Sequence, residues 1–247
     1  MREALTSLTT IRNIAKNQTD DAPIGQCEFG MCDGSGVAYF PHETPEYGVR
    51  AGHCKCRVKA IKRYKVDALV KKANIEGYES MTFENYVPKN TCQVDAKNQL
   101  QEHGSYYLFG PNGTGKTHLA IAGAIAAIKK GISTAFLLNL KLLNEIRNNL
   151  GKDAAGEIET AAKEINYLVI DDFDKTKVTD WVLEKMFEIV DARYIGWVSG
   201  KMCTTFTCNL TIKSLTEKYD SSIADRIAGM CNPIFLDGES YRRRDRV

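Results

Sequence analysis

Short apolar runs alternate with longer stretches of helical periodicity along the second half of the chain. Five runs predict strands, at 106–109, 132–138, 167–170, 202–207 and 233–236. Between them, apolar residues recur three or four positions apart and predict a helix at 92–103, two within 139–163, one at 178–194 and two short ones within 211–229. Strands that alternate with helices predict an α/β domain with a five-stranded parallel sheet, whose ligand binds at the carboxyl ends of the strands.

The first half of the chain has a weaker and more varied pattern. Residues 2–17 fit an amphipathic helix with apolar side chains along one side, at Leu5, Leu8, Ile11 and Ile14. Such a helix either packs against its own domain or contacts a partner protein. Residues 74–90 contain Gly77 and Pro88, which break helical periodicity, and they predict a connection into the second half.

Composition narrows the class of protein. A length of 247 residues favours two domains, or one domain with an appendage. Hydrophobic residues at 43% and charged residues at 26% are typical of globular proteins, and a net charge of +2 means that any nucleic-acid site must come from local clustering. No apolar run reaches the ~18 residues of a membrane span. The first residues lack the apolar core of a signal peptide, so we expect a cytoplasmic location.

Eight cysteines in a cytoplasmic chain are expected to be reduced, which directs attention to metal binding. Four of them form two close pairs, Cys27 with Cys32 and Cys54 with Cys56. Two thiol pairs separated by a loop predict a tetrahedral zinc site, and a structural one, because four protein ligands leave no open position. The second pair is tighter than usual, so His53 or His42 is an alternative ligand.

A basic stretch follows the second cysteine pair. Between Arg50 and Lys72 there are nine lysines and arginines and one acid, Asp67. Apolar residues from Val58 onward predict a helix with a basic face. Such a face suits DNA phosphates or an acidic protein surface, and it is equally consistent with a solvated helix.

The segment YYLFGPNGTGKT at 106–117 joins a predicted strand to a predicted helix through a phosphate-loop pattern. Its glycines let backbone N–H groups face inward, and the N-terminus of the helix adds partial positive charge. Lys116 is expected to reach the β- and γ-phosphates of ATP, and Thr117 to hold Mg²⁺. Phe83 and Tyr86 are candidates to pack near the base. The predicted nucleotide-binding residues are Gly110, Pro111, Asn112, Gly113, Thr114, Gly115, Lys116, Thr117 and His118.

Polar residues at two further strand ends complete the predicted site. Asp171 follows the apolar run at 167–170 and is expected to hold Mg²⁺. Asp172 is expected to orient the attacking water and to help deprotonate it. Asn209 follows the run at 202–207, where its amide either senses the γ-phosphate or places the water.

The motifs GPNGTGKTHLA, LVIDDF, TFTCNL, SSIADRI and GESYR, in this order, resemble the AAA+ ATPases that load replicative helicases, the bacterial DnaC and DnaI proteins and their phage relatives. The resemblance covers about 80–247. It implies that Asn209 is the sensor 1 residue, Arg226 an arginine finger that completes a neighbouring subunit's site, and Arg242 the sensor 2 residue. AAA+ proteins usually carry Glu where this chain has Asp172, which implies slow hydrolysis.

The cysteine segment resembles the zinc-bearing, helicase-binding domain of DnaI-type loaders. The resemblance therefore implies three parts: an N-terminal zinc-binding domain at 1–75, a linker at 76–90 and an AAA+ ATPase domain at 91–247, with a three-layer core. It also implies that the chain self-associates through the ATP interface and binds a replicative helicase and single-stranded DNA. Lys141 and Arg147 are candidate DNA contacts. Partner or DNA would stimulate the ATPase, and hydrolysis would release the helicase.

Three alternatives remain open at this point. A transposition helper ATPase of the IstB type shares nearly every ATP-site motif, although the N-terminal cysteines favour a loader. A phosphate-loop kinase would use Asp171 and Asp172 toward a small-molecule acceptor but would not need Arg226 and Arg242. In a binding module, ATP would be only structural.

Overall fold

The computed structural model describes residues 27–33, 35–41, 43, 49–59, 73–151 and 153–242. The chain divides into two compact units, which are described separately, the smaller with residues up to 59 and the larger with residues from 73 onward. The predicted amphipathic helix at 2–17 lies outside the described residues, as does most of the basic stretch after residue 59.

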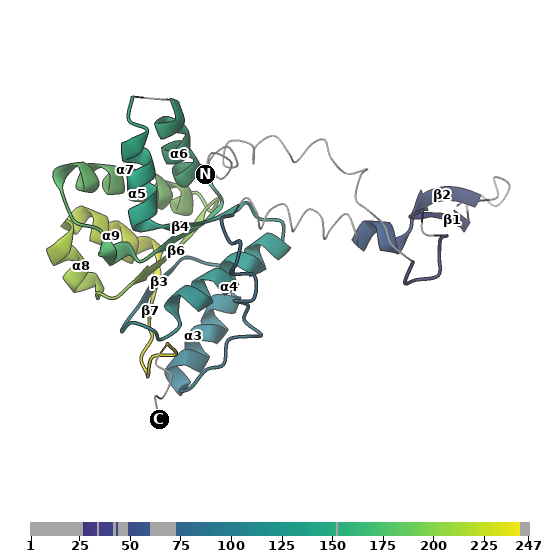
Figure 1. Ribbon diagram of the computed structural model, residues 1–247, viewed down its shortest axis with the longest axis horizontal. Helices are drawn as coiled ribbons and strands as arrows, with labels where there is room; N and C mark the ends of the chain where they lie inside the picture. Colours follow the sequence, from purple (N-terminus) through teal and green to yellow (C-terminus); the bar gives the residue numbers. More distant parts are fainter. Residues whose placement is uncertain are drawn as a thin grey trace. The chain divides into compact units, whose positions relative to one another are not determined.

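A five-stranded parallel sheet forms the centre of the larger unit (Figure 1). This confirms the predicted fold class. The strand order is β4-β5-β6-β3-β7. Strand β3, which precedes the glycine-rich loop, therefore lies between β6 and β7, the last two strands in the sequence. The bounds are β3 Tyr106–Phe109, β4 Thr134–Leu138, β5 Tyr167–Asp171, β6 Cys203–Cys208 and β7 Asn232–Phe235.

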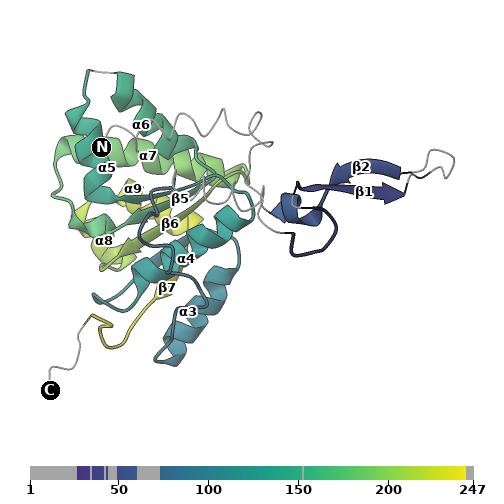
Figure 2. The same ribbon diagram turned by 45° about the vertical axis from the view of Figure 1, so that its right-hand side comes forward.

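Helices cover both faces of this sheet. In Figures 1 and 2, α3 and α4 lie on one face and α5 to α9 on the other, which gives three layers. The helices are α3 Thr91–Gln101, α4 Lys116–Lys129, α5 Asn139–Asn148, α6 Asp153–Glu164, the short 3₁₀ helix η2 Phe173–Lys175, α7 Asp180–Val198, α8 Ile212–Lys218 and α9 Ser221–Met230.

Two helices explain most of the packing around the sheet. The sequence of α4, KTHLAIAGAIAAIK, is apolar on nearly every side, as expected of a helix enclosed between a sheet and a second helix. On α7 the four predicted inward residues, Val182, Met186, Ile189 and Val190, are all buried. Thr179 caps this helix by accepting a hydrogen bond from the backbone N–H of Val182, which fixes where it begins.

Arg193, on the same face of α7, is the largest fully buried side chain among the described residues. Its Nε donates to Thr204 Oγ1 at 2.9 Å and its Nη2 to the Cys203 carbonyl at 2.6 Å, and its Nη1 bonds to the Ile165 carbonyl. Burial lowers the pKa of Arg193 to about 10. The guanidinium therefore ties α7 to the starts of β5 and β6, at the edge of the sheet opposite the strand ends that carry Asp171 and Asn209.

The smaller unit contains an antiparallel hairpin of β1 (Val37–Pro41) and β2 (Val49–His53), followed by helical residues at 55–59. The hairpin was not predicted from the sequence. Its buried centre consists of Ala38, Cys54 and Cys56, with Phe40 packed against them. So small an apolar centre suits a segment that is held together by cross-linking groups.

In the part of the chain that the structure describes, no helix combines the length and the apolar character needed to cross a membrane.

Candidate nucleotide site and candidate metal centre

The glycine-rich loop begins in a place where no side chain fits. Gly110 has a φ of 137°, and a Cβ built on it would lie 2.1 Å from the backbone oxygen of Leu236, which follows β7. At Gly115 the φ is 96°, and a Cβ would lie 2.6 Å from the ring of Tyr86. Both positions therefore require glycine for conformation and for space. Within the loop, Thr114 Oγ1 donates to the Pro111 carbonyl at 3.0 Å.

The ammonium of Lys116 lies inside this loop and has three acceptors. Its Nζ donates to the carbonyls of Gly110 and Pro111, both at 2.7 Å, and to Asn209 Oδ1 at 3.0 Å. Burial lowers the pKa of Lys116, and the nearby carboxylates of Asp172 and Asp174 oppose that shift. The lysine and Asn209 were predicted to serve one site, and the structure brings them into direct contact.

Asp171 ends β5 with its carboxylate nearly buried. Its Oδ1 accepts hydrogen bonds from Thr117 Oγ1 at 2.9 Å and from Thr207 Oγ1 at 2.6 Å. Burial raises the pKa of Asp171, and these two hydroxyls limit the rise. The predicted Mg²⁺ ligands, Thr117 and Asp171, thus lie in hydrogen-bond contact, and hydroxyl and carboxylate oxygens are the donors that Mg²⁺ prefers. The side chains of Thr117 and Asp171 therefore fit an Mg²⁺ ion.

Asp172 is half-buried beside this pair and adopts a backbone conformation that is uncommon outside glycine, with a φ of 54°. Its backbone N–H donates to Thr207 Oγ1 at 3.0 Å. Thr207 therefore bonds to both consecutive aspartates, although it was not predicted as a site residue. The alternation of polar and apolar residues in TFTCN, on a strand expected beside the site, was the available signal.

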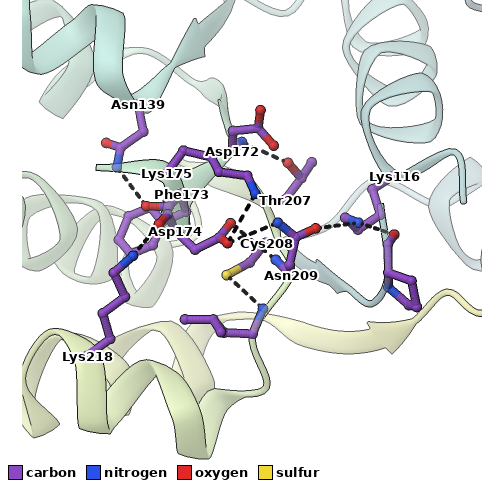
Figure 3. A network of polar contacts seen from close by, with 12 residues as sticks. Lys116, Asn139, Asp172, Phe173, Asp174, Lys175, Thr207, Cys208, Asn209 and Lys218 are labelled. Carbon is purple, nitrogen blue, oxygen red and sulfur yellow. Dashed lines mark hydrogen bonds and ion pairs between the residues drawn. The ribbon is translucent and has the colours of Figure 1, made fainter. Parts of the chain in front are cut away.

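Asp174 is a second residue that sequence reasoning missed. It lies on η2, and its Oδ2 accepts from Asn209 Nδ2 at 2.9 Å while its Oδ1 accepts from the Asn209 backbone N–H at 3.2 Å (Figure 3). Burial alone would raise the pKa of Asp174, but the two bonds from Asn209 and the charge of Lys175 outweigh it, and the pKa is lowered. The third acid in IDDFD was the only hint in the sequence.

The connection at 74–90, which carries Phe83 and Tyr86, packs against the glycine-rich loop and the first turn of α4. Both side chains are buried. Tyr86 donates through its hydroxyl to the Thr114 carbonyl at 3.3 Å, and its ring meets that of His118 edge-on with centroids 5.2 Å apart. His118 Nε2 is also 2.9 Å from the Thr82 carbonyl. Their relation to a base stays a prediction.

The C-terminal segment contacts both the glycine-rich loop and the connection at 74–90. The backbone N–H of Tyr241 donates to the Gly113 carbonyl at 2.9 Å, and the Tyr241 hydroxyl donates to the Val87 carbonyl at 2.6 Å. Arg242, the predicted sensor 2 residue, is therefore one residue from a direct contact with the loop, and its side chain is exposed.

Arg226, the predicted arginine finger, is not part of this constellation in its own chain. It lies on α9, where its Nε donates to Asp191 Oδ1 of α7 at 2.6 Å. Its guanidinium also stacks on the ring of Phe187, 4.6 Å from the centroid. A half-exposed arginine held away from its own loop is compatible with action on a neighbouring subunit, which stays a prediction.

The two candidate DNA contacts lie on α5 and are exposed. The guanidinium of Arg147 lies 4.6 Å from the centre of the Trp181 ring, whereas Lys141 is at the beginning of the helix. Their role stays a prediction.

In the smaller unit the two cysteine pairs meet. The Sγ atoms of Cys27, Cys32, Cys54 and Cys56 all lie within 4.8 Å of one another, with 3.7 Å between Cys27 and Cys54 and 3.5 Å between Cys32 and Cys56. Four sulfurs around a tetrahedral zinc ion, with Zn–S bonds of about 2.3 Å, are about 3.8 Å apart. The donor set therefore fits zinc. His53 is not part of this cluster, and His42 lies outside the described residues.

The thiols differ in their electrostatic surroundings. Burial alone would raise the pKa of Cys27, but backbone N–H groups of Met31, Cys32 and Phe29 outweigh it and lower the pKa to about 6. Burial and the neighbouring sulfurs raise the pKa of Cys56 to about 12. Four thiolates at these distances repel one another, and a cation would remove that cost.

A glycine-rich loop between a strand and a helix, a lysine inside it and an acid at the end of a neighbouring strand define an ATP-binding protein of the phosphate-loop class. The family described as IstB-like ATP binding protein matches residues 54–247, and the chain belongs to it. ATPase activity is expected of this family.

Among curated proteins, the chain is similar to an ATP-binding protein of insertion sequence IS232 from Bacillus thuringiensis subsp. berliner, with 29% identity over 59% of this chain and 58% of the relative. It is also similar to the replicative helicase loader DnaI of Bacillus subtilis, with 25% identity over 59% of this chain and 50% of the relative. The chain thus spans about half the length of these curated relatives.

Solved structures show the fold. The crystal structure of the DnaC helicase loader aligns with a TM-score of 0.58 at 23% identity, covering 66% of this chain and 99% of that one. The replication initiator DnaA bound to AMPPCP and single-stranded DNA aligns with a TM-score of 0.56 at 18% identity, covering 65% and 51%. The family match and the DnaI relative, together with this shared fold, confirm the predicted resemblance to helicase-loader ATPases.

Proposed function

We propose that the chain is an ATP-dependent loader that binds a replicative hexameric helicase and helps to place it on single-stranded DNA, with ATP hydrolysis driving release. The observation that carries the ATPase part is the contact of Lys116 with Asn209 beside the bonded pair of Thr117 and Asp171. These groups lie at the carboxyl ends of β3, β5 and β6, where the glycine-rich loop follows β3. Strand β6 pairs in parallel with both of the other strands.

Each residue has a defined task in this proposal. Lys116 exchanges its carbonyl and amide acceptors for phosphate oxygens when ATP binds. Thr117 and Asp171 would hold Mg²⁺, and the ion would supply positive charge to stabilise the phosphates during hydrolysis. Asp172 accepts a hydrogen bond from the attacking water. Because its carboxylate is shorter by one methylene than the Glu usual in AAA+ proteins, turnover is expected to be slow.

The assembled state depends on arginines. Arg226 of one chain reaches the phosphates held by its neighbour, so that ATP favours assembly, and Arg242 contacts the γ-phosphate within its own chain. The loss of the γ-phosphate removes both contacts and loosens the assembly. The thiol cluster supports a loader because it resembles the zinc-bearing domain of DnaI-type loaders, a similarity that the insertion-sequence alternative does not explain.

A transposition helper ATPase is the second candidate, and the relative from insertion sequence IS232 favours it. A pull-down with the replicative helicase of the organism that encodes the chain, in ATP and in ADP, separates the two. A loader retains the helicase in ATP and loses it in ADP, whereas a transposition helper does not retain the helicase with either nucleotide. Lys116→Ala should abolish the ATP effect, and Lys129→Ala, an exposed lysine on the same helix, is the matched control.

A further inference from the structure

The amide of Asn209 lies between two charged groups of opposite sign. Its Oδ1 accepts from Lys116 Nζ at 3.0 Å, and its Nδ2 donates to Asp174 Oδ2 at 2.9 Å (Figure 3). Asp174 also accepts from the backbone N–H of Asn209 at 3.2 Å. The acid therefore holds both the main chain and the side chain of this residue.

The orientation of the amide follows from elementary chemistry. An ammonium has only donors, so it must face the amide oxygen, and an ionised carboxylate has only acceptors, so it must face the NH₂ group. The lowered pKa of Asp174 keeps its carboxyl ionised near neutral pH. Both neighbours thus select the same orientation, with the oxygen of Asn209 toward the nucleotide site and its NH₂ group away from it.

The position of Asp174 is itself fixed by three hydrogen bonds to backbone carbonyls of η2. The Phe173 carbonyl accepts from Asn139 Nδ2 at 2.9 Å and from the Tyr219 hydroxyl at 2.5 Å. The Asp174 carbonyl accepts from Lys218 Nζ. Residues from α5 and from the end of α8 therefore anchor the turn, so that Asp174 is a stationary partner to which the Asn209 amide must adjust.

We propose that Asp174 is a positioning residue that presents the oxygen of Asn209 to the nucleotide, so that Asn209 acts as a hydrogen-bond acceptor during hydrolysis. Without ATP this oxygen holds Lys116. When Lys116 bonds to phosphate, the oxygen accepts a hydrogen bond from the attacking water. A turn of the Asn209 amide that brings its NH₂ group to the place of its oxygen, so that it faces the γ-phosphate, would break the bond to Asp174. The inference rests on the proposed ATPase function and chooses between the two roles predicted for Asn209.

Asp174→Asn tests this directly, because the amide keeps the size of the carboxylate but offers a donor as well as acceptors. The side-chain amide of Asn209 can then flip, because its NH₂ group and its oxygen can both bond to the new amide. The orientation of its oxygen toward the nucleotide site is no longer fixed. We expect kcat for ATP hydrolysis to fall on the order of tenfold, with KM within about twofold, since the misplaced group acts on water rather than on ATP binding. Asp180→Asn, the same change at an exposed position, is the control and should leave kcat unchanged.

A double-mutant cycle separates positioning from a general structural effect. If Asp174 acts through Asn209, then Asp174→Asn should lower kcat no further in an Asn209→Ala background. An independent, multiplicative loss would overturn the inference, as would a normal kcat in Asp174→Asn when Asn209→Ala is impaired. Both results leave the proposed function intact, which instead fails if Lys116→Ala binds and hydrolyses ATP normally.

If Asp174→Asn does not fold, the parent protein still provides a test. The side-chain amide protons of Asn209 can be assigned by their absence in Asn209→Ala. The proton that is donated to Asp174 should exchange slowly with water, with ADP and with a non-hydrolysable ATP analogue alike, because it stays in that hydrogen bond. Exchange that accelerates when the ATP analogue replaces ADP would mean that the amide leaves Asp174, and it would overturn the inference.

Discussion

Gly110→Ala should be among the most damaging single-methyl substitutions in the chain. An alanine there must adopt a φ of 137°, and its Cβ would lie 2.1 Å from the Leu236 backbone oxygen. That oxygen cannot retreat freely, because the N–H of Leu236 donates to the Phe109 carbonyl at 2.8 Å, next to the substituted residue. The clash therefore acts between two backbones that a hydrogen bond holds together.

The expected loss follows from two costs. A non-glycine residue in this backbone region costs about 1–3 kcal/mol. Forcing an extra methyl group against fixed neighbours costs about 1–3 kcal/mol more. The free energy of unfolding should therefore fall by about 2–6 kcal/mol, a large share of the roughly 5–15 kcal/mol typical of a folded protein. Urea unfolding followed by tryptophan fluorescence and circular dichroism measures it.

Gly131→Ala is the matched control. Its φ is also positive, at 80°, but a Cβ there meets no atom within 4 Å. It should lose only the conformational part, about 1–2 kcal/mol. If the two variants lose equal stability, the steric argument for Gly110 is wrong, and the close contact between the loop and the segment after β7 does not add to the cost of the substitution. Gly110→Ala should also weaken ATP binding, and Gly131→Ala should not.

Four further outcomes are expected. Lys116→Ala should weaken binding of a fluorescent ATP analogue by at least about tenfold, since a buried charge-assisted contact is worth roughly 1.5–3 kcal/mol. Thr207→Val removes a hydrogen bond that favours the ionised form of Asp171, so its pKa should rise further and the acid limb of the pH–rate profile should move to higher pH. Metal analysis of the full chain should find one zinc per chain, and substantially less in Cys54→Ser. Arg226→Ala should retain ATP binding but lose turnover in the assembled state, and mixing it with Lys116→Ala, which keeps the arginine, should restore part of that turnover.

The local part of the fold could be predicted because local signals agree. The strand at Tyr106–Phe109 and the loop after it were found from residues adjacent in sequence, and the inward face of α7 from its periodicity. The predicted strand at 132–138 begins later, at Thr134, because the backbone N–H of Ile132 still bonds to the Ala127 carbonyl of α4. The ends of helices and strands depend on capping hydrogen bonds, which the periodicity of apolar residues does not reveal.

Residues whose role depends on a distant neighbour escaped prediction. Thr207 became a site residue only because β6 lies beside β5, and nothing local specifies that order. In the sequence, Asp174 is one of several acids before a turn, and only its hydrogen bond with Asn209 makes it a site residue. Arg193 occupies an apolar helix face, and its burial depends on carbonyls at the starts of two strands. The hairpin of the smaller unit was missed because its strands are five residues each and contain proline and glycine.

The site explains ATP chemistry but does not select a partner. The contacts of Lys116 with Asn209 and of Thr117 with Asp171 join groups that are proposed to bind ATP and Mg²⁺. The chain is similar to an insertion-sequence ATP-binding protein, to a helicase loader and to replication initiators alike. Groups that differ between these classes must therefore lie outside the site. The thiol cluster is such a feature, since it is distant in sequence from every ATP-site residue. Partner choice should then follow the smaller unit: Cys54→Ser should weaken helicase capture while leaving ATP affinity unchanged. If a zinc-free Cys54→Ser protein captured the helicase as well as the parent protein does, the smaller unit would not determine partner choice, and the prediction would be wrong.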